Sequence, residues 1–146
     1  MKYLVYCLLA LVSLTACSSD DASYDNPYLA EPNFNYTINL SLPQYANLSV
    51  PGSTAYINQP NVGLRGVFVM NVSGSYRAWE AACPNHPIES CSTMTLSDVT
   101  CECSCEGYLY ELAGGNLIVD FQGEGKSYPL QEYSVSANGN TVRIFN

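Results

Sequence analysis

The chain has 146 residues, and its 13 Asp and Glu against five Lys and Arg give a formal net charge of −8. A chain of this length fits one domain with short additional segments. Phosphate groups and anionic lipid surfaces recruit Lys and Arg, so this charge argues against nucleic acid and against an anionic membrane surface as binding partners.

The first 16 residues predict a signal peptide. A short basic start, Met1-Lys2, is followed by the apolar run Leu4–Val12 and then by Leu14-Thr15-Ala16-Cys17. The apolar run is too short to span a bilayer. Leu14–Cys17 resembles the bacterial lipobox, and this resemblance implies cleavage before Cys17 and diacylation of the Cys17 thiol. The alternatives are an ordinary secreted protein cut nearby and an N-terminal membrane anchor.

Residues 17–33 are small, acidic and aperiodic, which predicts a solvated tether. Ser19-Asp20-Asp21 resembles the export signal of Bacteroidetes lipoproteins and so implies an outer-membrane lipoprotein of the cell envelope, exposed at the cell surface. A plain hydrophilic linker is the alternative. Loss of residues 1–16 removes Lys2, leaving a net charge of about −9. We therefore expect a soluble module held to the membrane only by the lipid on Cys17.

The remainder, residues 34–146, predicts a compact all-β domain. Phe34, Tyr36 and Ile38 alternate with polar residues, as in a half-buried strand. Asn138-Gly139 is a strong hairpin signal, because both residue types tolerate positive φ. No stretch shows sustained helical periodicity. The predicted strands, in chain order, are "FNYTINLSL" (34–42), "STAYIN" (53–58), "LRGVFVMN" (64–71), "SYRAWE" (75–80), "YSVSA" (133–137) and "NTVRIF" (140–145).

The segment 83–107 interrupts these strands and carries most of the cysteines, which predicts two loops displayed at one end of the domain. Cys7 leaves with the signal peptide and Cys17 takes the lipid, so five cysteines remain: Cys83, Cys91, Cys101, Cys103 and Cys105. Disulfides are the expected state in an exported protein. Because five is odd, at least one thiol is free, intermolecular or a ligand.

Three stretches together resemble a Rieske [2Fe–2S] domain: "AACPNHPIESC", "CECSCEGYLYELAGG" and "GEGKSYPLQEYSVSANGNTVRIFN". The resemblance covers about residues 60–146 and implies a β-sandwich or barrel with two cysteine-bearing loops at one end. It maps the two cluster cysteines of the family onto Cys83 and Cys103. It maps the disulfide between the loops onto Cys91 and Cys105.

The histidine positions depart from that family. Its first histidine position holds Asn85, with His86 one residue late, and its second holds Glu106. A Rieske centre needs two imidazoles on one iron, and the chain contains one histidine. A carboxylate at Glu106 could ligate iron but would lower the potential. The signal also has no twin arginine, so the chain is expected to cross the membrane unfolded, without a preassembled cluster.

Three interpretations of the loops stay open. The expected one holds no cofactor: Cys91–Cys105 is a disulfide, and Cys83 forms a second one with Cys101 or Cys103. In the second, Cys83, His86, Cys101 and Cys103 bind Zn²⁺, which needs no assembly machinery. In the third, Cys83 and Cys103, with His86 and Glu106 at the remaining positions, hold a variant 2Fe–2S cluster.

These interpretations lead to two function hypotheses. The leading one is a lipid-anchored, disulfide-stapled binding or structural module of the cell envelope. The alternative is a one-electron carrier with altered ligation, or a zinc-binding variant. One histidine leaves no visible Ser-His-Asp or Cys-His arrangement, and no phosphate-binding glycine loop is present, so catalysis is not expected. The partners predicted are the membrane, through Cys17, and a protein or redox partner whose identity stays open.

Overall fold

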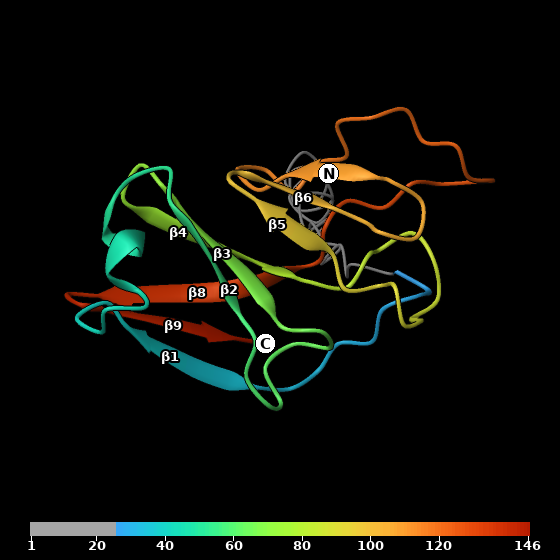
Figure 1. Cartoon of the computed structure of the whole chain (residues 1–146). Coiled ribbons are helices and arrows are strands. Elements are labelled where there is room, and N and C mark those ends of the chain that lie inside the picture. The colour runs from blue at the N-terminus through green and yellow to red at the C-terminus, as the bar shows by residue number, and fades with distance from the viewer. Residues whose placement is uncertain (1–25) are drawn as a thin grey trace, which may run out of the picture.

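The computed structural model describes residues 26–146 (Figure 1). The predicted signal peptide 1–16, the predicted lipidation site Cys17 and the first part of the predicted tether 17–33 lie outside the described residues. Within the described part, no helix is long and apolar enough to cross a membrane. The domain boundary expected at residue 34 stays a prediction.

The prediction of an all-β fold is confirmed, and the strands form two antiparallel sheets. The larger sheet has the order β1-β9-β8-β4-β3-β2 and the smaller one has the order β5-β6-β7. A single 3-10 turn, η1 (Ala46–Ser49), is the helical element of the described residues. The strands are β1 (Asn35–Asn39), β2 (Thr54–Ile57), β3 (Val67–Val72), β4 (Ser75–Glu80), β5 (Thr95–Ser97), β6 (Thr100–Glu102), β7 (Leu109–Glu111), β8 (Glu132–Asn138) and β9 (Thr141–Phe145).

The predicted strands are located correctly, with two differences. The hairpin at Asn138-Gly139 joins β8 to β9, with Asn138 opposite Thr141 and Gly139 at φ 55°. The first predicted strand, 34–42, ends at Asn39 because the Leu42 amide bonds back to the Asn39 carbonyl in a turn. The small sheet β5–β7 was not predicted. Its strands have three residues each, too few for an alternation to be recognised.

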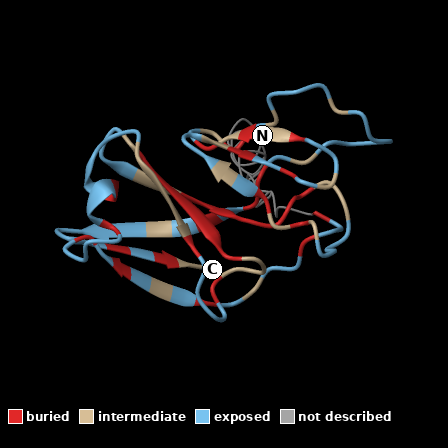
Figure 2. Ribbon diagram, in the orientation of Figure 1, coloured by how far each residue is buried: buried red, intermediate tan, exposed pale blue. Residues whose placement is uncertain are grey.

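Strand β3 is buried on both faces and separates two hydrophobic cores (Figure 2). Val67 and Val69 face the first core, which also contains Ile38, Val142 and Ile144 from the β1–β9 side. Phe68 and Met70 face the second core, into which the small sheet contributes Cys101 and Tyr110. The small sheet is therefore fastened to the large one by apolar packing across β3 and β4.

Glu80, at the end of β4, is a fully buried carboxylate that joins several segments of the fold. Its Oε1 accepts hydrogen bonds from the amides of Arg65 (2.9 Å) and Ala82 (2.8 Å). Its Oε2 accepts from the Leu64 amide (2.7 Å) and from the Tyr133 hydroxyl (2.6 Å). A buried carboxylate of this kind is tolerated because both of its oxygens accept hydrogen bonds. It holds the 58–66 loop, the start of the next loop and β8 together.

Gly115 allows the 112–116 turn to lie directly on the ring of Trp79. A Cβ atom at Gly115 would be 2.6 Å from two atoms of that ring. Trp79 is 2% exposed and donates from its indole nitrogen to the Leu112 carbonyl at 2.8 Å. The indole therefore locks the turn after β7 against β4.

Replacing Gly115 by alanine is expected to lower the free energy of unfolding by about 2–4 kcal/mol, through collision with Trp79 and strain at positive φ. Gly125→Ala is the matched control. Gly125 has a similar φ, 85° against 77°, but a Cβ there meets nothing within 4 Å. We expect its loss to be about 1 kcal/mol, from strain alone. Urea unfolding of both variants measures the difference, and equal losses would contradict the proposed contact.

Candidate metal site

Two loops lie side by side at one end of the domain. Loop one (residues 81–94) connects β4 to β5, and its base is closed by bonds from the Cys83 amide to the Ser92 carbonyl and from the Met94 amide to the Ala81 carbonyl, both 2.8 Å. Loop two (residues 103–108) connects β6 to β7. It is a tight turn in which the Gly107 amide bonds to the Cys103 carbonyl at 2.8 Å. Gly107 has φ 72°, a conformation that favours glycine.

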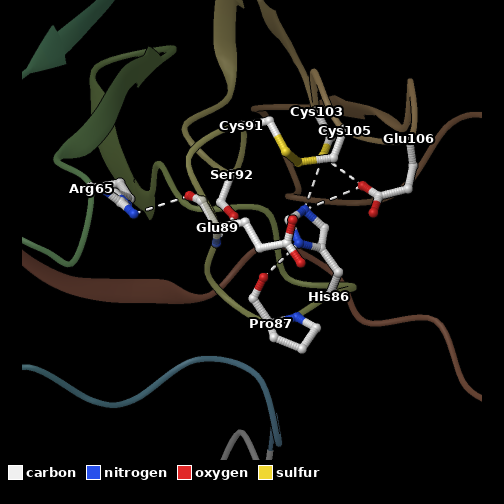
Figure 3. The surroundings of a disulfide bond; sticks show 9 residues. All are labelled: Arg65, His86, Pro87, Glu89, Cys91, Ser92, Cys103, Cys105 and Glu106. Atoms are coloured by element: carbon white, nitrogen blue, oxygen red, sulfur yellow. Dashed lines mark hydrogen bonds and ion pairs between the residues drawn. A yellow bond between two sulfur atoms is a disulfide. The ribbon is translucent and has the colours of Figure 1, made fainter.

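A disulfide between Cys91 and Cys105 joins the two loops (Figure 3). This is the pairing that the resemblance to Rieske domains implied. The other three described cysteines, Cys83, Cys101 and Cys103, are buried thiols. The second disulfide, expected between Cys83 and either Cys101 or Cys103, is not formed among the described residues. The count is therefore one disulfide and three thiols.

Removing this disulfide with the double variant Cys91→Ser, Cys105→Ser is expected to lower the free energy of unfolding by about 3 kcal/mol. The bond closes a loop with a sequence separation of 14, and the loss of that constraint enlarges the unfolded ensemble. Cys101→Ser is the control, because it removes a thiol and no disulfide. Urea unfolding with and without reductant measures the effect. If the reductant lowers the stability of the double variant as much as that of the native protein, the assignment of the Cys91–Cys105 disulfide is wrong.

Four side chains of the two loops converge on one point: Cys83, His86, Cys103 and Glu106. Their potential ligand atoms all lie within 4.8 Å of one another. His86 Nε2 is 3.4 Å from Cys103 Sγ and 3.2 Å from Glu106 Oε2, and Cys103 Sγ donates to Glu106 Oε2 at 2.9 Å. Figure 3 shows the imidazole pointing at Cys103 and Glu106, beside the disulfide.

The four donors differ in burial. Cys83 and Cys103 are 0% exposed, whereas the side chains of His86 and Glu106 are 11% and 33% exposed. The two sulfur atoms thus form the inner side of the group and the nitrogen and oxygen donors form its outer side. Such a group is reachable from solvent on one side and backed by the second hydrophobic core on the other.

The pKa values of the group reflect shared protons. The pKa of Cys83 is lowered chiefly because Cys103 hydrogen-bonds to its sulfur, and the pKa of Cys103 is raised by the same bond and then by burial. Burial acts to lower the pKa of His86, but its bonds to Cys103 and to the Pro87 carbonyl, together with the charge of Glu106, outweigh burial and raise it. A metal cation would replace these shared protons, since ligands must be deprotonated to bind.

Asn85, at the family's first histidine position, is committed to structural contacts. Its Nδ2 donates to the Tyr110 hydroxyl at 2.7 Å and to the Tyr128 carbonyl at 2.8 Å, and its Oδ1 accepts from the Tyr128 amide at 2.8 Å. The Asn85 side chain therefore fastens loop one to β7 and to the 121–130 segment. The next residue, His86, turns its ring to the group instead.

Cys101 does not join the group, in contrast to the expected zinc set Cys83, His86, Cys101 and Cys103. Cys101 lies within β6, opposite Leu96 and Tyr110, and its Sγ contacts Met94 Sδ at 3.8 Å inside the second core. Burial raises the pKa of its thiol to about 12. The set assembled by the structure has Glu106 in the place of Cys101.

Tyr110 is a site residue that the sequence gave no reason to single out. It is fully buried, accepts the hydrogen bond from Asn85, and places its hydroxyl 3.9 Å from Cys83 Sγ. Tyr108 and Tyr110 are both buried, whereas Leu109 between them is half-buried, so the two tyrosines share the inward face of the strand.

The donor set suits a single metal ion. Tetrahedral coordination with bonds of about 2.0–2.3 Å places donor atoms roughly 3.3–3.8 Å apart. The separation of 3.4 Å between His86 Nε2 and Cys103 Sγ lies in this range. The distances from Glu106 Oε2 to His86 Nε2 (3.2 Å) and to Cys103 Sγ (2.9 Å) lie below it, and small shifts of the side chains would bring Glu106 and Cys83 to it. The standard Rieske ligand set does not fit, because it needs two histidines and the chain contains one.

Comparisons with known proteins locate no relative by sequence: no family model matches the chain, and no curated protein matches it. Among solved structures, the plasma membrane Rieske protein PetC3 from Synechocystis PCC 6803 is 20% identical with a TM-score of 0.49, over 70% of this chain and 95% of that one. The Sphingomonas yanoikuyae B1 ferredoxin is 18% identical with a TM-score of 0.42, over 66% and 88% of the two chains.

A third solved structure is the terminal oxygenase of carbazole 1,9a-dioxygenase from Novosphingobium sp. KA1, which is 18% identical with a TM-score of 0.48. The alignment covers 77% of this chain but only 30% of the oxygenase, so this chain spans less than a third of that protein. Because all three TM-scores are below 0.5, we assign the site from this chain's own residues.

Proposed function

We propose that this chain is an exported lipoprotein of the cell envelope whose Rieske-like β domain binds one metal ion, preferentially Zn²⁺, and serves as a non-catalytic binding or structural module. Cys17 carries the lipid anchor. Cys83, His86, Cys103 and Glu106 hold the metal. The observation that carries the proposal is the convergence of these four donors within 4.8 Å.

The chemistry of the donors supports Zn²⁺. Thiolate sulfur, imidazole nitrogen and carboxylate oxygen are its usual protein ligands, and four of them complete a closed, structural coordination shell. Two donors come from loop one and two from loop two, so the ion would clamp the loops as the Cys91–Cys105 disulfide does. A closed shell leaves no position for a substrate, in agreement with the absence of any catalytic pattern in the sequence.

Elemental analysis of natively exported protein, combined with thiol counting and an assay for acid-labile sulfide, tests the proposal. We expect one zinc per chain, no sulfide, one disulfide, and thermal stability that falls when a chelator is added. Protein with no bound metal, whose melting temperature ignores both chelator and added Zn²⁺, would contradict it.

A one-electron carrier with an altered 2Fe–2S cluster is the second candidate. Two observations favour it: the donors divide into a buried thiol pair and an outer pair, and Cys103-x-x-Glu106 has the spacing of the family's second cysteine and histidine. In that case Cys83, Cys103, His86 and Glu106 would hold the cluster, and the bound cluster would supply one-electron transfer. The same elemental analysis and sulfide assay distinguish the two candidates, because a 2Fe–2S protein would contain iron and sulfide in equal amounts and no zinc.

A further inference from the structure

A cavity of about 610 Å³ lies beside the loop that joins β2 to β3. This volume is in the range of small-molecule sites in proteins, about 300–1,000 Å³. Its wall consists of residues 58–66 of that loop, with Tyr56 from β2 and Thr93 from loop one. Figure 3 shows Arg65 reaching loop one on the side away from Glu106, and the cavity shares no residue with the metal group. The cavity is therefore a second candidate site.

The wall of the cavity is held in one conformation by hydrogen bonds on its inner side. The amides of Leu64 and Arg65 donate to the buried carboxylate of Glu80 at 2.7 Å and 2.9 Å, and the Tyr56 hydroxyl donates to the Arg65 carbonyl at 2.6 Å. Gly66 lies so close to Tyr56 that a Cβ atom there would be 2.5 Å from the ring. A preformed wall reduces the ordering cost that binding must overcome.

The polar side chains at the rim of the cavity are hydrogen-bonding groups that the fold does not use. Asn58, Gln59 and Asn61 are exposed, and their carboxamides form no hydrogen bond with another residue of the described part. Arg65 donates from Nη2 to the Glu89 carbonyl at 3.0 Å and forms no ion pair with a described carboxylate. A guanidinium has five N–H donors, so most of those of Arg65 stay available to a ligand.

The cavity has little net charge. Arg65 is the one charged side chain among the described residues of its lining. The carboxylate of Glu80 lies directly behind the wall, where a Cβ atom at Gly63 would be 2.8 Å from its Oε2. The two opposite charges offset one another, so a strongly anionic or cationic ligand gains little from electrostatic attraction.

The ligand chemistry that suits this lining is a neutral saccharide. Sugar hydroxyl groups both donate and accept hydrogen bonds, as carboxamides do, and the C–H faces of a sugar ring can pack on the Tyr56 ring, Pro60 and Leu64. A peptide strand would instead need free backbone amides for a main-chain ladder. The amides of Val62, Leu64 and Arg65 are already bonded within the fold.

We propose that this cavity binds a neutral saccharide, whose hydroxyl groups bond to the carboxamides of Asn58, Gln59 and Asn61 and to the Arg65 guanidinium. The proposal rests on the binding-module role in the proposed function, for which it supplies the ligand class, and on neither the metal nor the lipid. Protein that binds saccharide without metal would contradict the proposed metal and leave the cavity assignment intact. Protein that binds metal without saccharide would do the reverse.

Calorimetric titration and saturation-transfer NMR test the proposal, with natively exported protein in a detergent that has no sugar group. The probes are the neutral disaccharides maltose and cellobiose. We expect a Kd in the millimolar range for at least one of them, because exposed hydrogen bonds compete with water. Arg65→Ala is expected to raise that Kd by about tenfold or more, since bonds from a charged donor are the stronger ones.

Arg143→Ala is the matched control, because Arg143 is an exposed arginine of β9 that does not line the cavity. We expect it to keep the native Kd. Asn61→Gly is a second test variant: it removes one carboxamide, and glycine suits the φ of 61° at this position. Circular dichroism establishes that each variant is folded, and Asn61→Gly decides if Arg65→Ala is not.

Three results would overturn the proposal. The first is that neither disaccharide binds to the folded protein. The second is that binding occurs but is unchanged in the folded cavity variants, which would place the sugar elsewhere. The third is that glucuronate, glucosamine or diglycine binds at the cavity more tightly than the neutral disaccharides, which would refute the proposed ligand class.

Discussion

Replacing Cys103 by serine is expected to lower the affinity for Zn²⁺ by more than 100-fold. Cys103 Sγ contacts both His86 and Glu106 and shares a proton with Cys83, so it is the central donor of the group. Loss of an outer-shell partner alone costs about 10–100-fold in affinity, and loss of a direct thiolate ligand costs more. Competition with a chromogenic chelator measures the change, using protein stripped of metal and reloaded.

Cys101→Ser is the matched control for this experiment. Cys101 is two positions away, is likewise 0% exposed and is likewise a free thiol, but its sulfur faces Met94 in the second core. We expect this variant to keep one zinc per chain at nearly native affinity. Circular dichroism confirms that both variants are folded. Equal affinities in the two folded variants would contradict the assignment of Cys103 as a ligand.

Replacing Glu80 by glutamine is expected to lower the free energy of unfolding by about 3–5 kcal/mol without any effect on metal stoichiometry. Glu80 is fully buried, and each of its two carboxylate oxygens accepts two hydrogen bonds. Glutamine keeps one oxygen and turns an amino group toward two donors, so those donors lose their acceptor. A buried unsatisfied donor costs about 1–3 kcal/mol, and a bond to a charged group contributes about 1.5–3 kcal/mol.

Glu132→Gln is the control, because it makes the same chemical change at an exposed position. Glu132 pairs with Arg77, and their side chains are 45% and 36% exposed. A surface ion pair of this kind contributes at most about 1 kcal/mol. Urea unfolding of both variants measures the two losses. If Glu80→Gln is no more harmful than Glu132→Gln, the buried carboxylate does not organise the 58–66 loop as described.

Local patterns in the sequence predicted the six strands of the larger sheet. The alternation around Tyr36 and Ile38 and the turn residues Asn138-Gly139 specify a half-buried strand and a hairpin from neighbours a few residues apart. The small sheet escaped prediction because β5, β6 and β7 are too short to show a period, and they are held by packing against Phe68 and Trp79. The role of Glu80 was not predicted because three of its four hydrogen bonds come from residues 15 to 53 positions away in the sequence.

The cysteines show the same division between local and long-range information. Cys101, Cys103 and Cys105 alternate, so a continuing strand would have placed all three on one face. Strand β6 ends at Glu102, however, and the turn beyond it sends Cys103 to the donor group and Cys105 to the disulfide, while Cys101 stays in the core.

The sequence by itself determined the all-β class and the β8–β9 hairpin. Its single histidine excludes the two-histidine Rieske ligand set, and its resemblance to Rieske domains implied the Cys91–Cys105 disulfide. Only the tertiary structure decided which donors meet. It selected His86 over Asn85 and Glu106 over Cys101, and it brought the entry of the chain beside loop one. The physical reason is that these contacts join segments 17 to 58 residues apart, whose approach depends on the packing of the second core rather than on local spacing.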